Sequence, residues 1–415
     1  MRTWWMGLVS TALVLSGCTS EPGGGAASPT APPTTAAPSA TTCPTGAAPD
    51  RAGDATQPRP SLPDWFRLAA MDPTSPRVIV GETGFVPEGA GQSTMGQVWA
   101  FDVCTNTWGQ LGEDGGPAAG ERPALGQFVT DPASGTVLGL ATGLSPVWSY
   151  APASGSWSAL PTTGGGSDMA WPKAAYDTTA DQVLAFDPNL ILADRAAAGR
   201  GASGVLAYRV DTQEWTTLEL AGGAEAEVPS VRMDQYDVAY DSAAGRLILV
   251  ITPEGSADRP GQTWAYDPQK ATWARGADIP DTLEGGYPAG GWATAFDPGT
   301  RRTWLFADTA MLGYDARSDD WVVAERDVGW PESMQLGDVE VDPIARSIDS
   351  MVLDPVNGRL VVFGGFVRPV GDPVGGFVEE GSMLATDDVW AYDPAANTWT
   401  MLLAPSDAPA SFGPG

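Results

Sequence analysis

An aromatic residue is followed seven positions later by a tryptophan at six places along this 415-residue chain. The six pairs are Phe101/Trp108, Tyr150/Trp157, Tyr208/Trp215, Tyr266/Trp273, Tyr314/Trp321 and Tyr392/Trp399. Successive tryptophans lie 49, 58, 58, 48 and 78 residues apart. A period of roughly 50 residues in a chain rich in short β-type runs predicts a radial array of small sheets.

The last copy shows what one repeat contains. Residues 348–354 alternate in polarity, and residues 359–365 form an apolar run that ends in Gly-Gly. The runs 389–393 and 398–403 follow, separated by a short turn. We therefore expect four short strands per repeat. Four strands cannot bury both faces alone, so neighbouring repeats must stack, with the aromatic–tryptophan hairpins filling the gaps.

The other copies follow the same plan, and each expected first strand ends at an aspartate: Asp72, Asp131, Asp177, Asp241, Asp297 and Asp354. The pattern strand-turn-strand-Gly-Gly, loop, VW-x-YDP-x-x-x-x-W resembles the kelch repeat over residues 64–403. Ala151 and Arg209 depart from it by replacing the aspartate of YDP. The resemblance implies a propeller scaffold like the central domain of galactose oxidase. Because residues 324–347 hold no seventh pair, we predict an all-β, six-bladed β-propeller of four-stranded antiparallel blades.

The N-terminus resembles a bacterial lipoprotein signal. Arg2 precedes an apolar stretch, residues 4–15, that is too short to span a bilayer. The sequence Leu-Ser-Gly-Cys that ends at Cys18 resembles a lipobox, which implies cleavage before Cys18 and its acylation, palmitate included. The expected location is the extracytoplasmic side of a bacterial cell membrane. The alternative is an ordinary secretory signal with a chance cysteine.

The segment that follows is almost wholly Gly, Ala, Ser, Thr and Pro, which predicts a disordered tether. As a flexible coil, the 42 residues 19–60 span roughly 35 Å. The expected organisation is therefore signal peptide 1–17, lipidated cysteine and tether 18–60, propeller 61–405 and C-terminal tail 406–415.

If Cys18 is lipidated, Cys43 and Cys104 remain as an even pair in an exported protein. Cys104 lies in the turn of the first aromatic–tryptophan hairpin. We predict a Cys43–Cys104 disulfide that pins the end of the tether to the first blade. The alternative is two unrelated free thiols.

Charge and composition exclude several functions. The formal net charge of −29 repels nucleic acids, so we expect no nucleic-acid partner. The chain has no histidine, which removes the Ser-His-Asp triad and metal sites built on imidazole, including the copper site of galactose oxidase. We predict no cofactor or metal. Residues 338–342 carry three carboxylates that could hold a hard cation, but a solvated acidic loop is the simpler interpretation.

Loop length varies on one side of the expected propeller only. The first-to-second and third-to-fourth strand turns are uniformly short, whereas the other connections are long: residues 81–97, 186–204, 276–291, 324–347 and 364–388. We call these two sides the short-turn face and the long-loop face. Because a rigid scaffold presents its loops for function, the long-loop face is the candidate binding surface.

The loop 364–388 offers Phe366, Arg368, Phe377, Glu379 and Glu380 as candidate ligand contacts. It can be interpreted as a ligand-covering flap or as an insertion without function. The aromatic residues Trp171, Tyr287 and Trp330 lie on or beside the same face. Such rings suit sugars and peptides, but in propellers they more often fill gaps between blades.

A second candidate is the mouth of the central channel, because first strands line the axis in this family. The polar residues expected to converge there are Arg67, Gln127, Lys173, Asp237 and Asp349. Lys173 and Asp237, on adjacent blades, would form either a ligand site or a structural ion pair.

The absence of recognisable catalytic sets favours a binding scaffold for a protein, peptide or glycan. The alternative is a carbohydrate-active hydrolase or lyase, since that chemistry needs only two carboxylates, roughly 5–5.5 Å or 6.5–9.5 Å apart. A cleft with two converging carboxylates would favour the enzyme.

Overall fold

The computed structural model describes residues 42–60, 66–83, 95–111, 125–164, 173–191, 201–223, 227–229, 231, 236–251, 261–280, 292–307, 310–324, 330–347, 350–370, 384–406 and 410–411. All of them belong to one compact unit, which begins at Pro38. None of the helices in this described part of the chain has the length and apolar character that crossing a bilayer requires.

Six sheets follow one another along the chain, and four antiparallel strands form the body of each. We call them blades 1 to 6. Blade 1 consists of β1 (Phe66–Met71), β2 (Arg77–Thr83), β3 (Met95–Asp102) and β4 (Thr107–Gln110). Blade 2 consists of β5 (Leu125–Asp131), β6 (Thr136–Ala141), β7 (Val147–Ala151) and β8 (Ser156–Leu160). Blade 3 consists of β10 (Lys173–Asp177), β11 (Gln182–Phe186), β12 (Ala202–Arg209) and β13 (Glu214–Glu219), and β9 (Thr163–Gly164) pairs with β13 in parallel.

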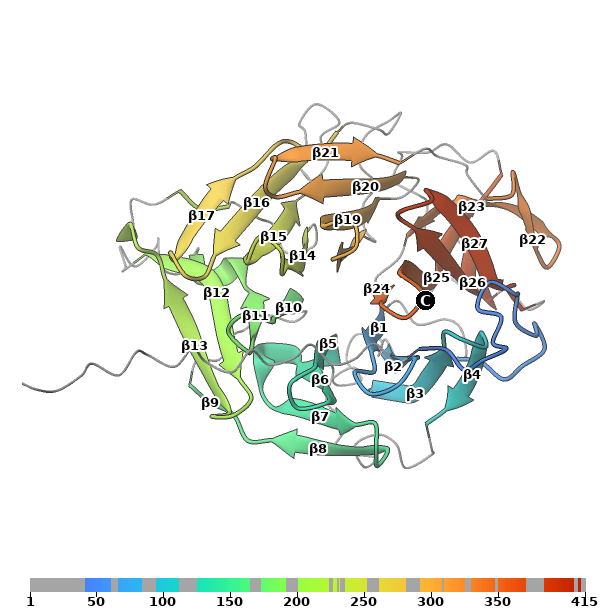
Figure 1. The fold of residues 1–415 in the computed structure, drawn as a ribbon, viewed down its shortest axis with the longest axis horizontal. Helices are drawn as coiled ribbons and strands as arrows, with labels where there is room; N and C mark the ends of the chain where they lie inside the picture. The colour runs from blue at the N-terminus through green and yellow to red at the C-terminus, as the bar shows by residue number, and fades with distance from the viewer. Residues whose placement is uncertain are drawn as a thin grey trace, which may run out of the picture. The chain divides into compact units, whose positions relative to one another are not determined.

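Blades 4 to 6 repeat the plan. Blade 4 consists of β14 (Tyr236–Asp241), β15 (Arg246–Ile251), β16 (Gln262–Asp267) and β17 (Thr272–Arg275). Blade 5 consists of β18 (Trp292–Asp297), β19 (Arg302–Ala307), β20 (Ala310–Asp315) and β21 (Asp320–Val323). The body of blade 6 consists of β24 (Met351–Asp354), β25 (Arg359–Pro369), β26 (Leu384–Asp393) and β27 (Thr398–Leu403). The first strand of each blade contacts the first strand of the next, and β24 of blade 6 contacts β1 of blade 1. The ring in Figure 1 is therefore closed, with these first strands around its axis, which confirms the predicted six-bladed propeller.

The aromatic–tryptophan pairs form hairpins, as predicted. Tyr266 of β16 lies directly opposite Trp273 of β17, and the other five pairs have the same register. The ring centroids of every pair are 5.0–5.1 Å apart. The strands pair in this way because the four-residue turn between them fixes the register.

Three of these tryptophans also bind the preceding blade. The indole N–H of Trp215 donates to the carbonyl of Leu144 at 2.9 Å, and that of Trp273 to the carbonyl of Ser203 at 2.8 Å. Trp321 donates to the hydroxyl of Thr263 at 3.1 Å. The repeat thus supplies both the apolar filling between blades and a hydrogen bond across the gap.

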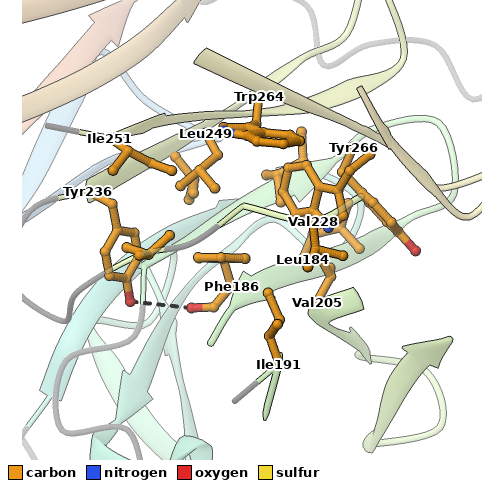
Figure 2. Close-up of a cluster of buried hydrophobic side chains, with 14 of the residues drawn as sticks. Leu184, Phe186, Ile191, Val205, Val228, Tyr236, Leu249, Ile251, Trp264 and Tyr266 are labelled. Carbon is orange, nitrogen blue, oxygen red and sulfur yellow. Dashed lines mark hydrogen bonds between the residues drawn. The ribbon is translucent and has the colours of Figure 1, made fainter. Parts of the chain in front are cut away.

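The apolar core lies between the sheets. Figure 2 shows the cluster between blades 3 and 4, where Phe186 and Val205 of blade 3 meet Leu249 and Tyr266 of blade 4. The hydroxyl of Tyr236 points to the carbonyl of Phe186, 3.5 Å away. Both faces of each blade are apolar because each packs on a neighbour, so the middle strands read as continuous apolar runs rather than alternating ones.

An aspartate closes each turn between first and second strands. Asp354, for example, is fully buried and accepts backbone N–H groups from Val356 and Asn357. The other five strand-ending aspartates are also buried and each accepts at least one such bond. A buried carboxylate is tolerated here because its oxygens are hydrogen-bonded. These aspartates therefore build the short-turn face rather than a site.

The segment 364–388 is not a single loop, contrary to the sequence-based expectation. Strand β25 continues to Pro369, and β26 begins at Leu384. The extension of β25 pairs with β23 (Val339–Ser347), which pairs with β22 (Met334–Leu336), while β28 (Ala410–Ser411) pairs with β26. Blade 6 is thus a seven-stranded sheet. Val341 and Val367 are fully buried in a small core of this extension, which explains why its ends are strands.

Residues 42–60 are packed on the propeller, although composition alone places them in the tether. They span the seam between blades 1 and 6. Gly53 donates its N–H to the carbonyl of Leu402 in β27 at 2.7 Å, and the carboxamide oxygen of Gln57 accepts from the N–H of Trp108 in β4 at 2.7 Å. Arg359 of β25 reaches back to the carbonyl of Pro49 at 3.1 Å. We call residues 42–60 the clasp.

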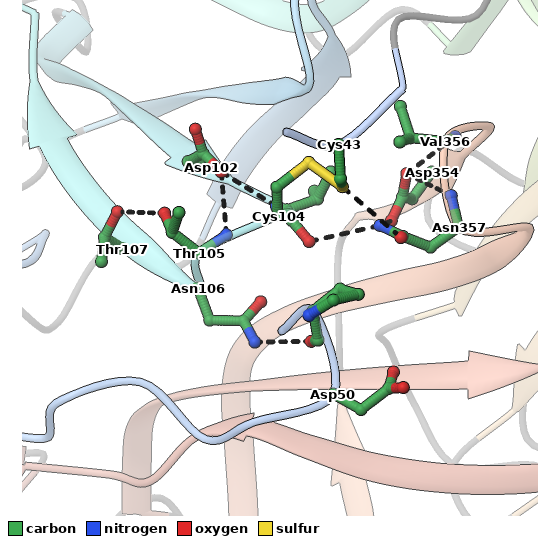
Figure 3. Close-up of a disulfide and its surroundings, with 12 residues drawn as sticks. Cys43, Asp50, Asp102, Cys104, Thr105, Asn106, Thr107, Asp354, Val356 and Asn357 are labelled. Atoms are coloured by element: carbon green, nitrogen blue, oxygen red, sulfur yellow. Dashed lines mark hydrogen bonds between the residues drawn. A yellow bond between two sulfur atoms is a disulfide. The ribbon is translucent and has the colours of Figure 1, made fainter. Parts of the chain in front are cut away.

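A disulfide joins the clasp to blade 1 (Figure 3). It links Cys43 to Cys104, the pair expected from the cysteine count, and closes a sequence separation of 61 residues. Asn357, in the β24–β25 turn of blade 6, donates to the carbonyl of Val103 beside it at 3.2 Å. The disulfide therefore lies where the clasp, blade 1 and blade 6 meet, on the short-turn face.

Candidate functional site

Lys173 and Asp237 lie together near the axis, on the first strands of blades 3 and 4. Their Nζ and Oδ1 atoms are 3.5 Å apart. The other oxygen of Asp237 accepts the backbone N–H of Thr294 at 2.6 Å and its hydroxyl at 2.9 Å. One buried carboxylate therefore links three consecutive blades, because Thr294 belongs to β18 of blade 5.

The bonding of Asp237 separates a structural role from a catalytic one. Both of its oxygens are engaged, and only 7% of the residue is exposed. The side chain of Lys173 keeps 24% exposure, and an ammonium has three donors. Asp237 is thus held by Lys173 and Thr294, and Lys173 is the partly exposed member of the ion pair.

Two further polar residues adjoin this pair. Tyr236 precedes Asp237 in β14, and Asp187, which follows β11, accepts the N–H of Asn189 at 2.8 Å. Burial raises the pKa of the Tyr236 phenol, and the carboxylates of Asp187 and Asp237 raise it further. Tyr236 is therefore a neutral hydrogen-bond donor at physiological pH, not a base.

The remaining axial candidates are placed less closely. Gln127 lies in β5 and is half-buried, with its amide group 3.5 Å from the carbonyl of Phe128. Arg67 occupies β1 opposite Glu82, a strand position without a described side chain. Asp349 lies outside the described residues. Of the five axial candidates, Lys173 and Asp237 are the two that the structure shows in contact.

The candidates from segment 364–388 have mixed outcomes. Phe366 is buried, with 7% exposure, and lies in β25 opposite Ser347 of β23, so it belongs to the sheet extension and not to a loop. Arg368 occupies β25 opposite Asp342 of β23. Phe377, Glu379 and Glu380 lie outside the described residues and stay predictions.

Trp330 fills a gap between blades rather than facing a ligand. Its ring centroid lies 4.0 Å from that of Trp390 and 4.7 Å from that of Trp399, and the residue is buried. The other two aromatic residues noted beside the long-loop face, Trp171 and Tyr287, lie outside the described residues.

No group of three or more carboxylate or cysteine side chains is arranged to hold a metal ion in the ranges described above. The acidic run 338–342 crosses the β22–β23 turn and enters β23, where successive side chains point to opposite faces. Glu340 accepts the hydroxyl of Ser333. The run is therefore part of a β-hairpin.

Sequence reasoning missed Thr294 and the ion pair of Arg59 with Asp387. The guanidinium of Arg59, in the clasp, lies 3.3 Å from the Asp387 carboxylate, and Asp387 also accepts the N–H of Ser406 at 2.7 Å. A single arginine in a Gly/Pro-rich segment gives no signal of such a contact. Thr294 could have been found, because it is one position beyond the aligned axial residue of blade 5.

Comparison with known proteins agrees with the architecture. The Kelch motif matches residues 349–402, which is blade 6. No curated protein matches the sequence. The class that fold and repeat define is a six-bladed β-propeller with a kelch motif in its last blade.

Three solved structures illustrate the similarity of fold, and they belong to proteins of different kinds. One is a protein of unknown function from Bacteroides thetaiotaomicron, with 12% identity and a TM-score of 0.44 over 75% of this chain and 70% of that chain. An auxiliary nutrient binding protein from the same organism has 9% identity and a TM-score of 0.39, covering 68% of this chain and 65% of its own. A GH74 xyloglucanase from Xanthomonas campestris has 14% identity and a TM-score of 0.45, covering 82% and 47%. Similarity at this level concerns the fold alone.

Proposed function

We propose that this protein is a lipid-anchored extracytoplasmic scaffold that binds a protein, peptide or glycan on the long-loop face of its propeller. The observation that carries the proposal is the difference between the two faces. Among the described residues, the strands added to the repeat lie mainly in blade 6, on the long-loop side, where β22, β23 and the ends of β25 and β26 form a sheet extension.

The short-turn face has little to offer a ligand. Its turns are short and close on themselves through aspartates and tight backbone bonds, as at Asp241, which accepts the N–H groups of Ala243 and Ala244. Gly245 in the same turn donates its N–H to the carbonyl of Asp241 at 2.8 Å. Groups that are already paired within a turn are unavailable to a partner.

The sheet extension presents a more varied surface. Gln335, Asp338 and Glu340 of the β22–β23 hairpin are exposed, and so is Val370, with 52% exposure. A rigid hairpin that carries exposed polar and apolar groups suits partner recognition, because little side-chain and loop freedom is lost on binding.

The enzyme alternative receives less support from the described residues. It needs two carboxylates that face a substrate, and the axial candidates include two carboxylates, Asp237 and Asp349. Both oxygens of Asp237 are engaged by Lys173 and Thr294. A carboxylate so bonded would have to break these contacts before it could act on a sugar. Asp349 lies outside the described residues.

The test is a cross-linked pull-down of the lipidated protein from native membranes. One variant replaces residues 371–383 by a short Gly-Ser linker, which leaves β25 and β26 intact; a second carries Gln335→Arg and Glu340→Arg on the hairpin. A matched control places Ala395→Ser and Ala396→Ser in a short turn of the same blade. Capture of a defined partner that either long-loop variant abolishes, and the control retains, supports the proposal.

A partner retained by both long-loop variants, or lost only in the control, contradicts the proposal. If no partner is captured, a glycan array is screened with the same four proteins, where binding that the long-loop changes abolish gives the same support. Hydrolysis of a glycan without stable binding would favour the enzyme alternative.

A further inference from the structure

The ring of blades closes at the seam between blades 6 and 1, where the two ends of the propeller sequence meet. Blade 1 is built from β1 to β4 and the body of blade 6 from β24 to β27, and none of the described strands belongs to both. The two blades share an apolar cluster instead. The ring centroid of Phe363 in blade 6 lies 5.6 Å from those of Phe101 and Trp108 in blade 1.

The hydrogen bond that the repeat supplies at other seams is missing here. The indole N–H groups of Trp215, Trp273 and Trp321 each donate to the preceding blade. Trp108 has the same place in blade 1, but its indole nitrogen is buried and has no hydrogen-bond partner among the residues that the structure describes. This seam is therefore joined in another way.

The clasp runs along the seam and contacts both of its sides. At its start, Cys43 is bonded to Cys104 of blade 1, and the Cys43 sulfur lies 3.7 Å from the carboxamide oxygen of Asn357 in blade 6 (Figure 3). Near its end, Arg59 pairs with Asp387 of β26 at 3.3 Å. Because β26 runs from the long-loop face to the short-turn face, the clasp extends from the disulfide on the short-turn face toward the long-loop face.

The middle of the clasp is shaped to fit between the two blades. Gly53 donates its N–H to the carbonyl of Leu402 in blade 6 at 2.7 Å, and a Cβ at Gly53 would lie 2.2 Å from the carbonyl oxygen of Asn106 in blade 1. Glycine permits this close approach because it has no Cβ. Asn106 donates its side-chain N–H groups to the carbonyls of Pro49 and Arg51 at 2.6 and 2.8 Å.

Burial contributes little to holding the clasp in place. Within this segment, which the structure describes throughout, 12 of 19 residues are exposed and Pro60 alone is buried. The net contribution of its hydrogen bonds is small, because the same groups bond to water when the clasp is free. The chain fixes one end of the clasp to β1, and the disulfide fixes the other end, which makes its docking an intramolecular event at both ends.

We propose that the clasp is a redox-released latch on the seam between blades 6 and 1. The Cys43–Cys104 disulfide keeps the latch closed, and reduction lets the clasp leave the seam while the other blades stay folded. This inference goes beyond the proposed binding function and does not depend on it.

The reductant is a dithiol, and the exposure of the two sulfurs determines which one it attacks. Cys43 is partly exposed, whereas Cys104 is fully buried. A thiolate of the reductant attacks the Sγ of Cys43, and Cys104 leaves as a thiolate. The second thiolate of the reductant then displaces Cys43. The dithiol ends as a cyclic disulfide, and its two protons end on the two protein thiols.

Hydrogen exchange of backbone amides tests the latch directly. The amides of Gly53 and Trp108 form bonds between the clasp and the propeller. The matched control is the amide of Ala221, which follows β13 of blade 3 and donates to the carbonyl of Ala271 in blade 4 at 2.9 Å. Exchange in the full chain is read by mass spectrometry before treatment with excess dithiothreitol, after it, and again after reoxidation.

We expect the amides of Gly53 and Trp108 to exchange at least about tenfold faster after reduction, because local opening then becomes easier. The amide of Ala221 should not change, and reoxidation should restore the slow exchange. The double variant Cys43→Ser/Cys104→Ser should exchange rapidly at Gly53 and Trp108 with or without dithiothreitol.

Unchanged exchange at Gly53 and Trp108 after reduction overturns the latch, because the clasp would then be held without its disulfide. Equal acceleration at Ala221 also overturns it, since reduction would then loosen the whole propeller. If the double variant does not fold, the reduced and reoxidised wild-type protein gives the comparison. Exchange that stays fast after reoxidation would contradict control by this disulfide.

Discussion

The indole N–H of Trp273 in blade 4 donates a hydrogen bond to the backbone carbonyl of Ser203 in blade 3, at 2.8 Å. The tryptophan that defines the sequence repeat is therefore a link between blades. Trp157 occupies the equivalent position in blade 2, where its indole nitrogen is buried and has no hydrogen-bond partner. The two residues have the same place in the repeat and differ in this bond and in burial, since Trp273 is buried and Trp157 only partly so.

This difference predicts unequal effects of the same substitution. Trp273→Phe removes ring volume and a hydrogen bond and leaves the Ser203 carbonyl unpaired, whereas Trp157→Phe removes ring volume and an unpaired donor. We expect Trp273→Phe to lower the free energy of unfolding by about 1–2 kcal/mol more than Trp157→Phe. Urea unfolding followed by circular dichroism measures both. Equal losses would show that the inter-blade bond contributes nothing.

The disulfide predicts a redox-dependent stability. Closing a loop of 61 residues by a cross-link restricts the unfolded chain and stabilises the fold by about 4 kcal/mol in the chain-entropy model. The double variant Cys43→Ser/Cys104→Ser should therefore unfold at lower denaturant concentration. Wild-type protein in excess dithiothreitol should match it, and the variant should not respond to the reductant. A wild-type midpoint that ignores the reductant would contradict the prediction.

Arg359 predicts a local loosening of the clasp. Its guanidinium contacts Asp354 at 3.1 Å and the carbonyls of Pro49 and Val103. Arg359→Met leaves the fully buried Asp354 without its cation, which costs about 3–5 kcal/mol. We also expect faster tryptic cleavage after the exposed Arg51.

The matched control is Arg317→Met, which removes an exposed arginine that pairs with Asp315 at 3.2 Å. No measurable change is expected in either unfolding or cleavage, because solvent screens such a pair. Unchanged cleavage after Arg51 in Arg359→Met would mean that the clasp is held without this arginine.

A structural feature of this molecule can be predicted from the sequence where its pattern repeats. The blades can be predicted, because the aromatic–tryptophan spacing specifies a hairpin and the strand-ending aspartate specifies a turn in each of the six repeats. The contacts of the clasp do not repeat: Gly53, Gln57 and Arg59 each bond to the propeller at one place, to residues more than 40 positions away, and the composition of the segment predicts a tether.

The candidate site was predictable in the same uneven way. Aligning first strands placed Lys173 and Asp237 on adjacent blades, and they meet. Phe366 was misplaced because Gly364-Gly365, a turn signal in the repeat, is a bulge through which β25 continues. Pairing with β23 decides the conformation there, and that strand lies outside the repeat.

The buried tyrosines predict alkaline instability. Burial raises the pKa of Tyr208 to about 12, against 10 in the unfolded chain. Between these values the folded state holds a proton that the unfolded state has lost, so stability falls as pH rises from 10 to 12 and is unaffected below 10. Tyrosinate absorbance should therefore appear together with unfolding.

Tyr208→Phe tests whether Tyr208 contributes to the alkaline loss of stability, because the hydroxyl of Tyr208 is buried without a partner. The variant should be as stable as wild type or slightly more stable at pH 8, and should lose stability less steeply above pH 10. The comparison is Tyr314→Phe, which removes a hydroxyl that donates to Asp319 at 2.7 Å and should destabilise the fold at pH 8. A Tyr208→Phe variant that is less stable at pH 8 than Tyr314→Phe would contradict the different hydrogen bonding of the two hydroxyls.

Ala271 ends the turn between β16 and β17 in a left-handed conformation, with φ of 52°, at the position where Asn397 stands in blade 6. An L residue with a Cβ is strained there by about 1–2 kcal/mol, and glycine is not, although glycine costs about 0.5–1 kcal/mol of chain entropy. We therefore expect Ala271→Gly to stabilise the fold by roughly 0.5–1 kcal/mol, measured by urea unfolding. Ala274→Gly, in the exposed part of β17, adds the same conformational-entropy cost without relieving backbone strain, so it should destabilise the fold. Destabilisation by both would show that the turn is not strained.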